Sequence, residues 1–162
     1  MSIPVTRPVT TLPAPTLLAL SQHGLAEAAA TPAPGERYAL AHLAALRAAA
    51  AVLSCRAKPG ETRRGRPSSA WVLLSRVAPE LSEWAAFFAA GAQKRAAAEA
   101  GFTGVVTPRE ADDLLRDAQS FLAVVETTLT GHLSGHLSGH PSGHLSGHLS
   151  GHLAGSLRSR AG

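Results

Sequence analysis

Five basic residues between positions 56 and 66 have side chains that could contact phosphate groups. They are Arg56, Lys58, Arg63, Arg64 and Arg66, in a segment that also contains proline and glycine. Lysine and arginine bind the phosphates of nucleic acids without reading the base sequence. No aromatic residue lies among them, so stacking on single-stranded bases is not indicated. The alternative is a solvated loop that only keeps the protein soluble.

A Gly-His-Leu-Ser repeat, which begins at Gly131, supplies imidazole groups that could bind Zn²⁺ or Ni²⁺. Glycine at every fourth position destabilises a helix by about 1 kcal/mol each. The repeat also has too little apolar area to offset its chain entropy, so residues 131–162 are predicted to be a disordered tail. The near-identical units are typical of an expanded short DNA repeat. We therefore expect no evolved metal site, and only incidental binding at His132, His136, His140, His144, His148 and His152.

Arg37 and His42 form an Arg-x4-His pair near the start of a predicted helix. Five helical residues turn through about 500°, so the two side chains point roughly 140° apart. They could still converge if Arg37 lies in the first turn and reaches over. Otherwise His42 is a packing residue that shares a stripe with Tyr38 and Ala45. No nucleophile–histidine pattern, phosphate-binding loop or carboxylate pair is recognisable, and we expect no cofactor.

The helix with the clearest sequence signals begins after Thr107. Thr107, Pro108 and Glu110 form a capping box with proline at the first helical position. Apolar residues then recur at alternating spacings of four and three, as in a coiled-coil seam. This seam must pack on the core of the domain, on a second copy or partner, or on both. It consists of Ala111, Leu115, Ala118, Leu122, Val125 and Leu129.

Four other helical segments are predicted, at residues 14–30, 36–56, 69–77 and 79–100, with prolines and glycines between them. Alanine, leucine, arginine and glutamate favour helices, whereas aromatic residues make up only 4% of the chain. The sequence therefore predicts an all-α, four- to five-helix up-and-down bundle over residues 14–130. A Pro/Thr-rich lead-in at residues 1–13, expected to be disordered, precedes it.

Charge and composition favour no particular partner. The net charge is +4, but Arg158 and Arg160 lie in the tail, which contains no acidic residue. The single cysteine, Cys55, lies in an alanine-rich run and is expected in the core. No signal peptide and no uncharged apolar run of about 18 residues is apparent, so we expect a cytoplasmic protein without membrane contact.

Three stretches of the chain resemble a small actinobacterial family of HEPN domains (higher eukaryote and prokaryote nucleotide-binding). They are residues 36–50 (ERYALAHLAALRAAA), 69–89 (SAWVLLSRVAPELSEWAAFFA) and 107–118 (TPREADDLLRDA). The resemblance covers about residues 14–130 and excludes the tail. It implies a four- to five-helix bundle of a kind that often forms a homodimer.

The resemblance also implies a functional direction. Many HEPN domains are metal-independent ribonucleases, or partners of minimal nucleotidyltransferases in toxin–antitoxin pairs. In active members an Arg-x4–6-His motif lies near the dimer interface, where histidine transfers a proton and arginine stabilises phosphate charge. Arg37 and His42 match this spacing. They depart from the pattern because Tyr38 replaces the usual polar residue and because the motif lies on an early helix.

Three functions follow as expectations. The leading one is a domain that binds RNA, a nucleotide or a protein partner without catalysis. The first alternative is a metal-independent ribonuclease of the toxin–antitoxin type that uses Arg37 and His42. The second alternative is a structural dimerisation or adaptor bundle that pairs through the seam on the last helix.

Overall fold

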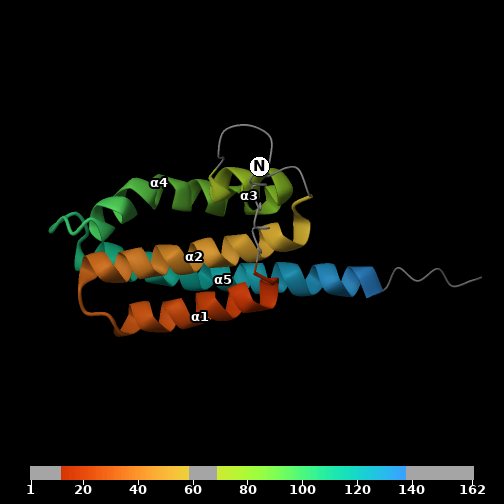
Figure 1. Ribbon diagram of the computed structural model, residues 1–162, viewed down its shortest axis with the longest axis horizontal. Helices are drawn as coiled ribbons and strands as arrows, with labels where there is room; N and C mark the ends of the chain where they lie inside the picture. Colours follow the sequence, from red (N-terminus) through yellow and green to blue (C-terminus); the bar gives the residue numbers. More distant parts are fainter. Residues whose placement is uncertain (1–11, 59–68, 138–162) are drawn as a thin grey trace, which may run out of the picture.

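A computed structural model describes residues 12–58 and 69–137, and these residues form an all-helical bundle (Figure 1). Five α-helices and one short 3₁₀ helix occur in the described ranges: α1 (Ala14–Ala30), α2 (Pro34–Arg56), α3 (Ala70–Val77), η1 (Pro79–Leu81), α4 (Ser82–Glu99) and α5 (Pro108–Leu137). No strand occurs among them. The predicted all-α class is confirmed, and the predicted helix limits differ from the observed ones by a few residues.

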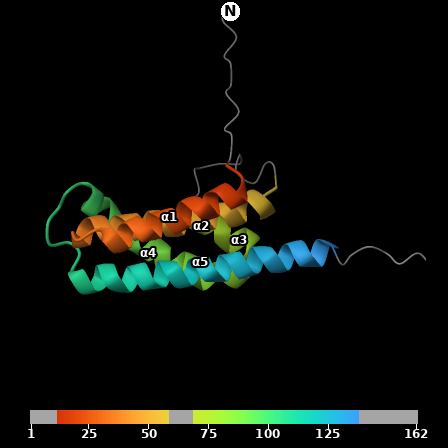
Figure 2. The same ribbon diagram turned by 90° about the horizontal axis from the view of Figure 1, so that it is seen from below.

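Helix α2 is the central element, with α1 and α5 along one side and the α3–α4 layer along the other (Figures 1 and 2). Small residues line the contact between α1 and α2. Ser21 donates a buried hydrogen bond to the Ala44 carbonyl (2.8 Å). A Cβ atom added to Gly24 would lie 3.4 Å from the Ala44 Cβ. The alanine-rich face of α2 therefore lets α1 approach closely.

Aromatic residues fill the other side of α2. Trp71 of α3 stacks on Phe88 of α4, with ring centroids 5.1 Å apart, and Phe121 of α5 lies 5.2 Å from Phe88. Trp84 stacks on Phe88 from the preceding turn of α4. This aromatic cluster joins α3, α4 and α5, and it contains four of the seven aromatic residues of the chain.

The helix ends follow the local signals in the sequence. Thr107 and Glu110 form the predicted capping box, since the Glu110 amide donates to Thr107 Oγ1 (3.2 Å) and the Thr107 amide donates to Glu110 Oε2 (2.8 Å). Ser69 accepts a hydrogen bond from the Val72 amide and caps α3. Gly101 adopts φ +82° after α4, as expected for a residue that ends a helix in the left-handed conformation.

Helix α5 differs from its prediction in its C-terminal limit, and the structure shows which of the expected surfaces its seam contacts. It continues through Leu137, so the expectation that the disordered tail begins at Gly131 is wrong for residues 131–137. Extending an existing helix needs no new nucleus, and this offsets the cost of the glycines. The seam is also internal: Leu115 is partly buried, and the other seam residues are buried within the single chain, namely Ala111, Ala118, Leu122, Val125 and Leu129.

The central position of α2 also explains its composition. By length and hydropathy alone, α2 could cross a membrane, with a mean hydropathy of 1.5 over its most apolar window. Half of that window is buried inside the bundle, and the core helix of a soluble protein has the same properties. The run of alanines therefore serves close contact between helices.

Candidate functional site

His42 lies in the core of the bundle, on the side of α2 that faces α3 and α4. Its side chain is 1% exposed. The rings of Trp71 and Phe88 approach it edge-on, each with a centroid separation of 5.8 Å. Its Nε2 lies 2.8 Å from the Phe88 carbonyl oxygen, whereas Nδ1 is buried with no hydrogen-bond partner among the described residues.

These contacts define the chemical state of the His42 ring. A carbonyl oxygen can only accept, so Nε2 carries the proton and Nδ1 is the unprotonated nitrogen. Burial lowers the pKa of His42, because the charged imidazolium would lose its solvation, although the Phe88 carbonyl acts in the opposite direction. His42 is therefore a neutral core residue near pH 7. A proton could be transferred to it only if the core opened.

Arg37 points away from His42, toward the ends of neighbouring helices. Its Nε donates to the Thr31 carbonyl (2.8 Å) and its Nη2 to the Pro32 carbonyl (3.2 Å). Its Nη1 forms an ion pair with Asp112 in the first turns of α5. Arg37 does lie in the first turn of α2, but it reaches toward α5. The structure thus does not bring the Arg-x4-His pair together.

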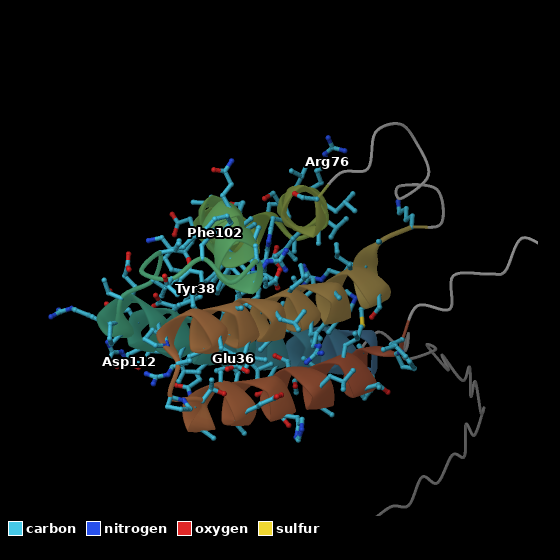
Figure 3. All side chains as sticks on the ribbon, turned by 60° about the vertical axis from the view of Figure 1, so that its left-hand side comes forward. Glu36, Tyr38, Arg76, Phe102 and Asp112 are labelled. Carbon is cyan, nitrogen blue, oxygen red and sulfur yellow. The ribbon has the colours of Figure 1, made fainter. Side chains whose placement is uncertain are left out.

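A second polar group closes the same end of the bundle. Tyr38 points from α2 toward α4 (Figure 3), and its hydroxyl would lie 2.8 Å from a Cβ atom on Gly91. Close by, Lys94 Nζ donates to Glu110 Oε1 (2.5 Å). This hydrogen bond, with those from Thr107, lowers the pKa of Glu110 to about 2. Glycine at position 91 is thus needed for Tyr38 to fit beneath α4.

The basic cluster is only partly within the described residues. Arg56 ends α2 and forms an ion pair with Glu80, which leaves less of its charge for a ligand. Lys58 is exposed. The other members, Arg63, Arg64 and Arg66, lie outside the described residues, and the predicted phosphate contact stays a prediction.

The tail histidines are placed only in part. His132 is exposed on α5, and His136 lies in its last turn. The remaining four lie outside the described residues, at positions 140, 144, 148 and 152. Within the described ranges no group of three or more metal-binding side chains is close enough to hold an ion.

An open groove lies at the opposite end of the bundle from Arg37. The first turn of α1, the last turn of α2 and the C-terminal part of α5 meet there (Figures 1 and 2). The groove has a volume of about 650 Å³ and a mainly apolar lining that includes Leu18, Cys55 and Leu129. Cys55 is exposed, so its predicted place in the core is wrong. The last turn of α2 reaches the groove, where no other helix covers the thiol.

The sequence did not reveal this groove, because its lining comes from three helices far apart in the chain. Glu126 and Thr130 belong to the polar side of α5, and in the sequence alone nothing distinguishes them from other surface residues. Cys55 follows the buried Val52 by three residues and so continues the buried stripe of α2, which means that the periodicity gave no sign of its exposure.

Comparisons with known proteins agree with the fold. A family model described as SAV_6107-like HEPN matches residues 28–126, which is more than half of the chain. No curated protein and no solved structure matches the chain. The match includes the α2 segment with Arg37 and His42, the aromatic core and the capped start of α5. The chain therefore belongs to the SAV_6107-like HEPN family.

Proposed function

We propose that this HEPN domain is a binding module that does not cleave RNA. The position of His42 carries the proposal. A general acid or base must come within hydrogen-bond distance of its substrate, directly or through one water molecule. The His42 imidazole is enclosed by Trp71 and Phe88, and its protonated nitrogen is already bonded to the Phe88 carbonyl. RNA at the surface of the bundle could not reach it.

Arg37 supports the same proposal. A guanidinium that stabilises phosphate charge needs donors directed at the phosphate. Those of Arg37 are directed at two backbone carbonyls and at the Asp112 carboxylate. Phosphate binding would have to displace Asp112. The pair holds the start of α2 against the start of α5, which is a structural role.

Cleavage of RNA by the full chain in EDTA tests the proposal. The informative variant is Arg37→Ala, with Arg116→Ala as a matched control. Arg116 also forms an ion pair with an aspartate, Asp113, although its side chain is more exposed than that of Arg37. The full chain and both variants should leave RNA intact to the same extent. If the full chain and Arg116→Ala cleave RNA and Arg37→Ala does not, the domain is a ribonuclease and the proposal is wrong.

For the ligand, we propose RNA or nucleotide phosphate bound by the segment that follows α2. The support is the density of positive charge at Arg63, Arg64 and Arg66. Replacing all three with serine should weaken RNA binding for every sequence alike. It should also reduce the slope of log affinity against log salt by roughly 0.7 to 0.9 for each phosphate that the variant no longer neutralises. Unchanged affinity in the triple variant would refute this mode of binding.

A protein partner is the second candidate, and exposed aromatic residues favour it. Phe87 on α4 is 46% exposed, and Phe102, after α4, is 67% exposed. Because the seam on α5 is internal, a homodimer would need such a surface. Sedimentation equilibrium of the full chain and of Phe87→Ser with Phe102→Ser tests this. A dimer that the substitutions leave intact would refute these residues as the interface.

A further inference from the structure

The strongest unassigned feature is the open groove between the start of α1, the end of α2 and the C-terminal part of α5. We propose that residues 1–11 of the same chain bind in this groove as an extended segment. These residues lie outside the described ones, and the proposal rests on where they begin, on their side-chain pattern and on their charge.

The covalent connection places the segment at the groove. Ala14 and Pro15, the first residues of α1, line the groove themselves. Pro13 precedes them in an extended conformation, with φ −61° and ψ 149°. The segment therefore starts at the edge of the apolar surface. A tethered segment has a high effective concentration there, so weak contacts suffice to hold it.

The segment is long enough to cover the groove. In an extended, strand-like conformation, eleven residues span roughly 36 Å. Along α5 the lining runs from Glu126 to His132, which corresponds to about 9 Å of helix. The prolines at positions 4 and 8 disfavour helix and favour an extended backbone at the residues before them.

The side chains of the segment suit an apolar groove when the backbone is extended. Alternate residues of an extended chain point to opposite sides. Ile3, Val5 and Val9 thus share one side, and Thr6 and Thr10 share the other. The first side also carries Arg7 and Thr11 but is mainly apolar, like the lining of the groove, whereas the two threonine hydroxyls on the second side are suited to water.

The charge of the segment is also complementary to that of the groove. Arg7 is the only charged side chain among residues 1–11, and it falls on the same side as the three apolar residues. Glu126 lines the groove, and one oxygen of its carboxylate accepts a hydrogen bond from Gln22 (2.5 Å). A carboxylate has further acceptor sites, so Arg7 can pair with Glu126 without displacing Gln22.

Cys55 provides the test, because it lines the groove and is the single cysteine of the chain. The rate of its alkylation by iodoacetamide is compared between the full chain and the variant Ile3→Ser, Val5→Ser, Val9→Ser. The variant should react faster by roughly tenfold, as for a groove covered about nine-tenths of the time. Thr6→Ala with Thr10→Ala, on the opposite side, is the matched control and should not change the rate. Arg7→Ser should increase the rate by a smaller factor.

Three outcomes would overturn the proposal. The first is an equal rate in the full chain and in the serine variant, with helix content by circular dichroism unchanged in both. The second is a faster rate only after removal of residues 138–162, which would make the tail the occupant. The third is a rate that falls as protein concentration rises, which would assign the groove to a second copy.

Discussion

The two ends of the bundle differ in how the helix ends are covered. At the first end, where α2 and α5 begin, ion pairs and caps join the helices: Arg37 binds Asp112, and Lys94 binds Glu110. At the second end, where α1 begins and α2 ends, the helices leave a mainly apolar groove of about 650 Å³. The end with the residues expected for catalysis is closed, and the end without them is open.

This difference shows that residue types alone do not locate a site. Arg37, Tyr38 and His42 lie nearer the first end, and the side chain of each is occupied by contacts within the chain. Leu18, Cys55 and Glu126 at the second end form no recognisable catalytic pattern, yet they line an open groove of about 650 Å³. The following predictions test whether the first end is structural and the second is available for binding.

The largest effect is expected at His42. Replacing it with alanine should reduce the free energy of unfolding by about 3 kcal/mol, because the substitution leaves a cavity among Trp71 and Phe88. Urea unfolding of the full chain measures this. The control is His23→Ala at an exposed position of α1, which should cost less than about 0.5 kcal/mol. Equal, small effects would mean that His42 is outside the core. Because His42→Ala is expected to destabilise the fold, loss of activity in this variant would not show that His42 is catalytic.

The stability of the bundle should depend on the protonation of His42. Because burial lowers the pKa of His42 in the folded state, the unfolded chain binds the proton more readily. Stability is therefore full above about pH 6.5 and falls as the pH decreases below it, by at most about 1.4 kcal/mol per pH unit. The decrease ends at the folded pKa. His42→Gln should remove this component from the urea-unfolding profile, and an unchanged profile would argue against a buried neutral ring.

A moderate effect is expected at the capping box. Thr107→Ala removes the hydroxyl that accepts from the Glu110 amide, and should destabilise the domain by about 1 kcal/mol. Thr103→Ala, at an exposed position of the preceding loop, is the control. Thermal unfolding of both variants makes the comparison. If the two variants have the same melting temperature, the capping box does not stabilise the first end of the bundle.

The smallest effect is expected at Cys55, at the open end. Cys55→Ala should change the free energy of unfolding by less than about 0.5 kcal/mol, because the thiol is exposed. Val52→Ala, one turn earlier on α2 and fully buried, should cost about 2 kcal/mol. Similar destabilisation by the two substitutions would place Cys55 in the core after all.

Much of the fold could be predicted because its signals are local. The capping box at Thr107, the cap at Ser69 and the left-handed glycine at position 101 each depend on residues within one or two turns. The stripe with Tyr38 and His42 also indicated a buried side of α2 correctly. Periodicity did not say what would cover a given side, so the seam on α5 was open to three assignments. The structure resolves it as an internal contact.

The candidate sites were harder to predict, because they depend on contacts between distant residues. Arg37 reaches Asp112, which lies far along the chain, and no spacing rule connects them. Cys55 was expected in the core from its neighbours, but its exposure depends on where α1 starts. Helix α5 continues through Leu137 because the residues before the repeat already form a helix, which can be extended despite the glycines. The composition of the repeat alone does not show this.

The state of the His42 ring tests the central claim most directly. Long-range proton–nitrogen NMR correlations distinguish the two neutral tautomers from imidazolium, and the His42 signal is identified by its absence in His42→Gln. The structure predicts a neutral ring with the proton on Nε2, and a ring that stays neutral below pH 6.5. A ring protonated on Nδ1, or one that becomes charged at the ordinary histidine pKa, would contradict the buried position and reopen catalysis by Arg37 and His42.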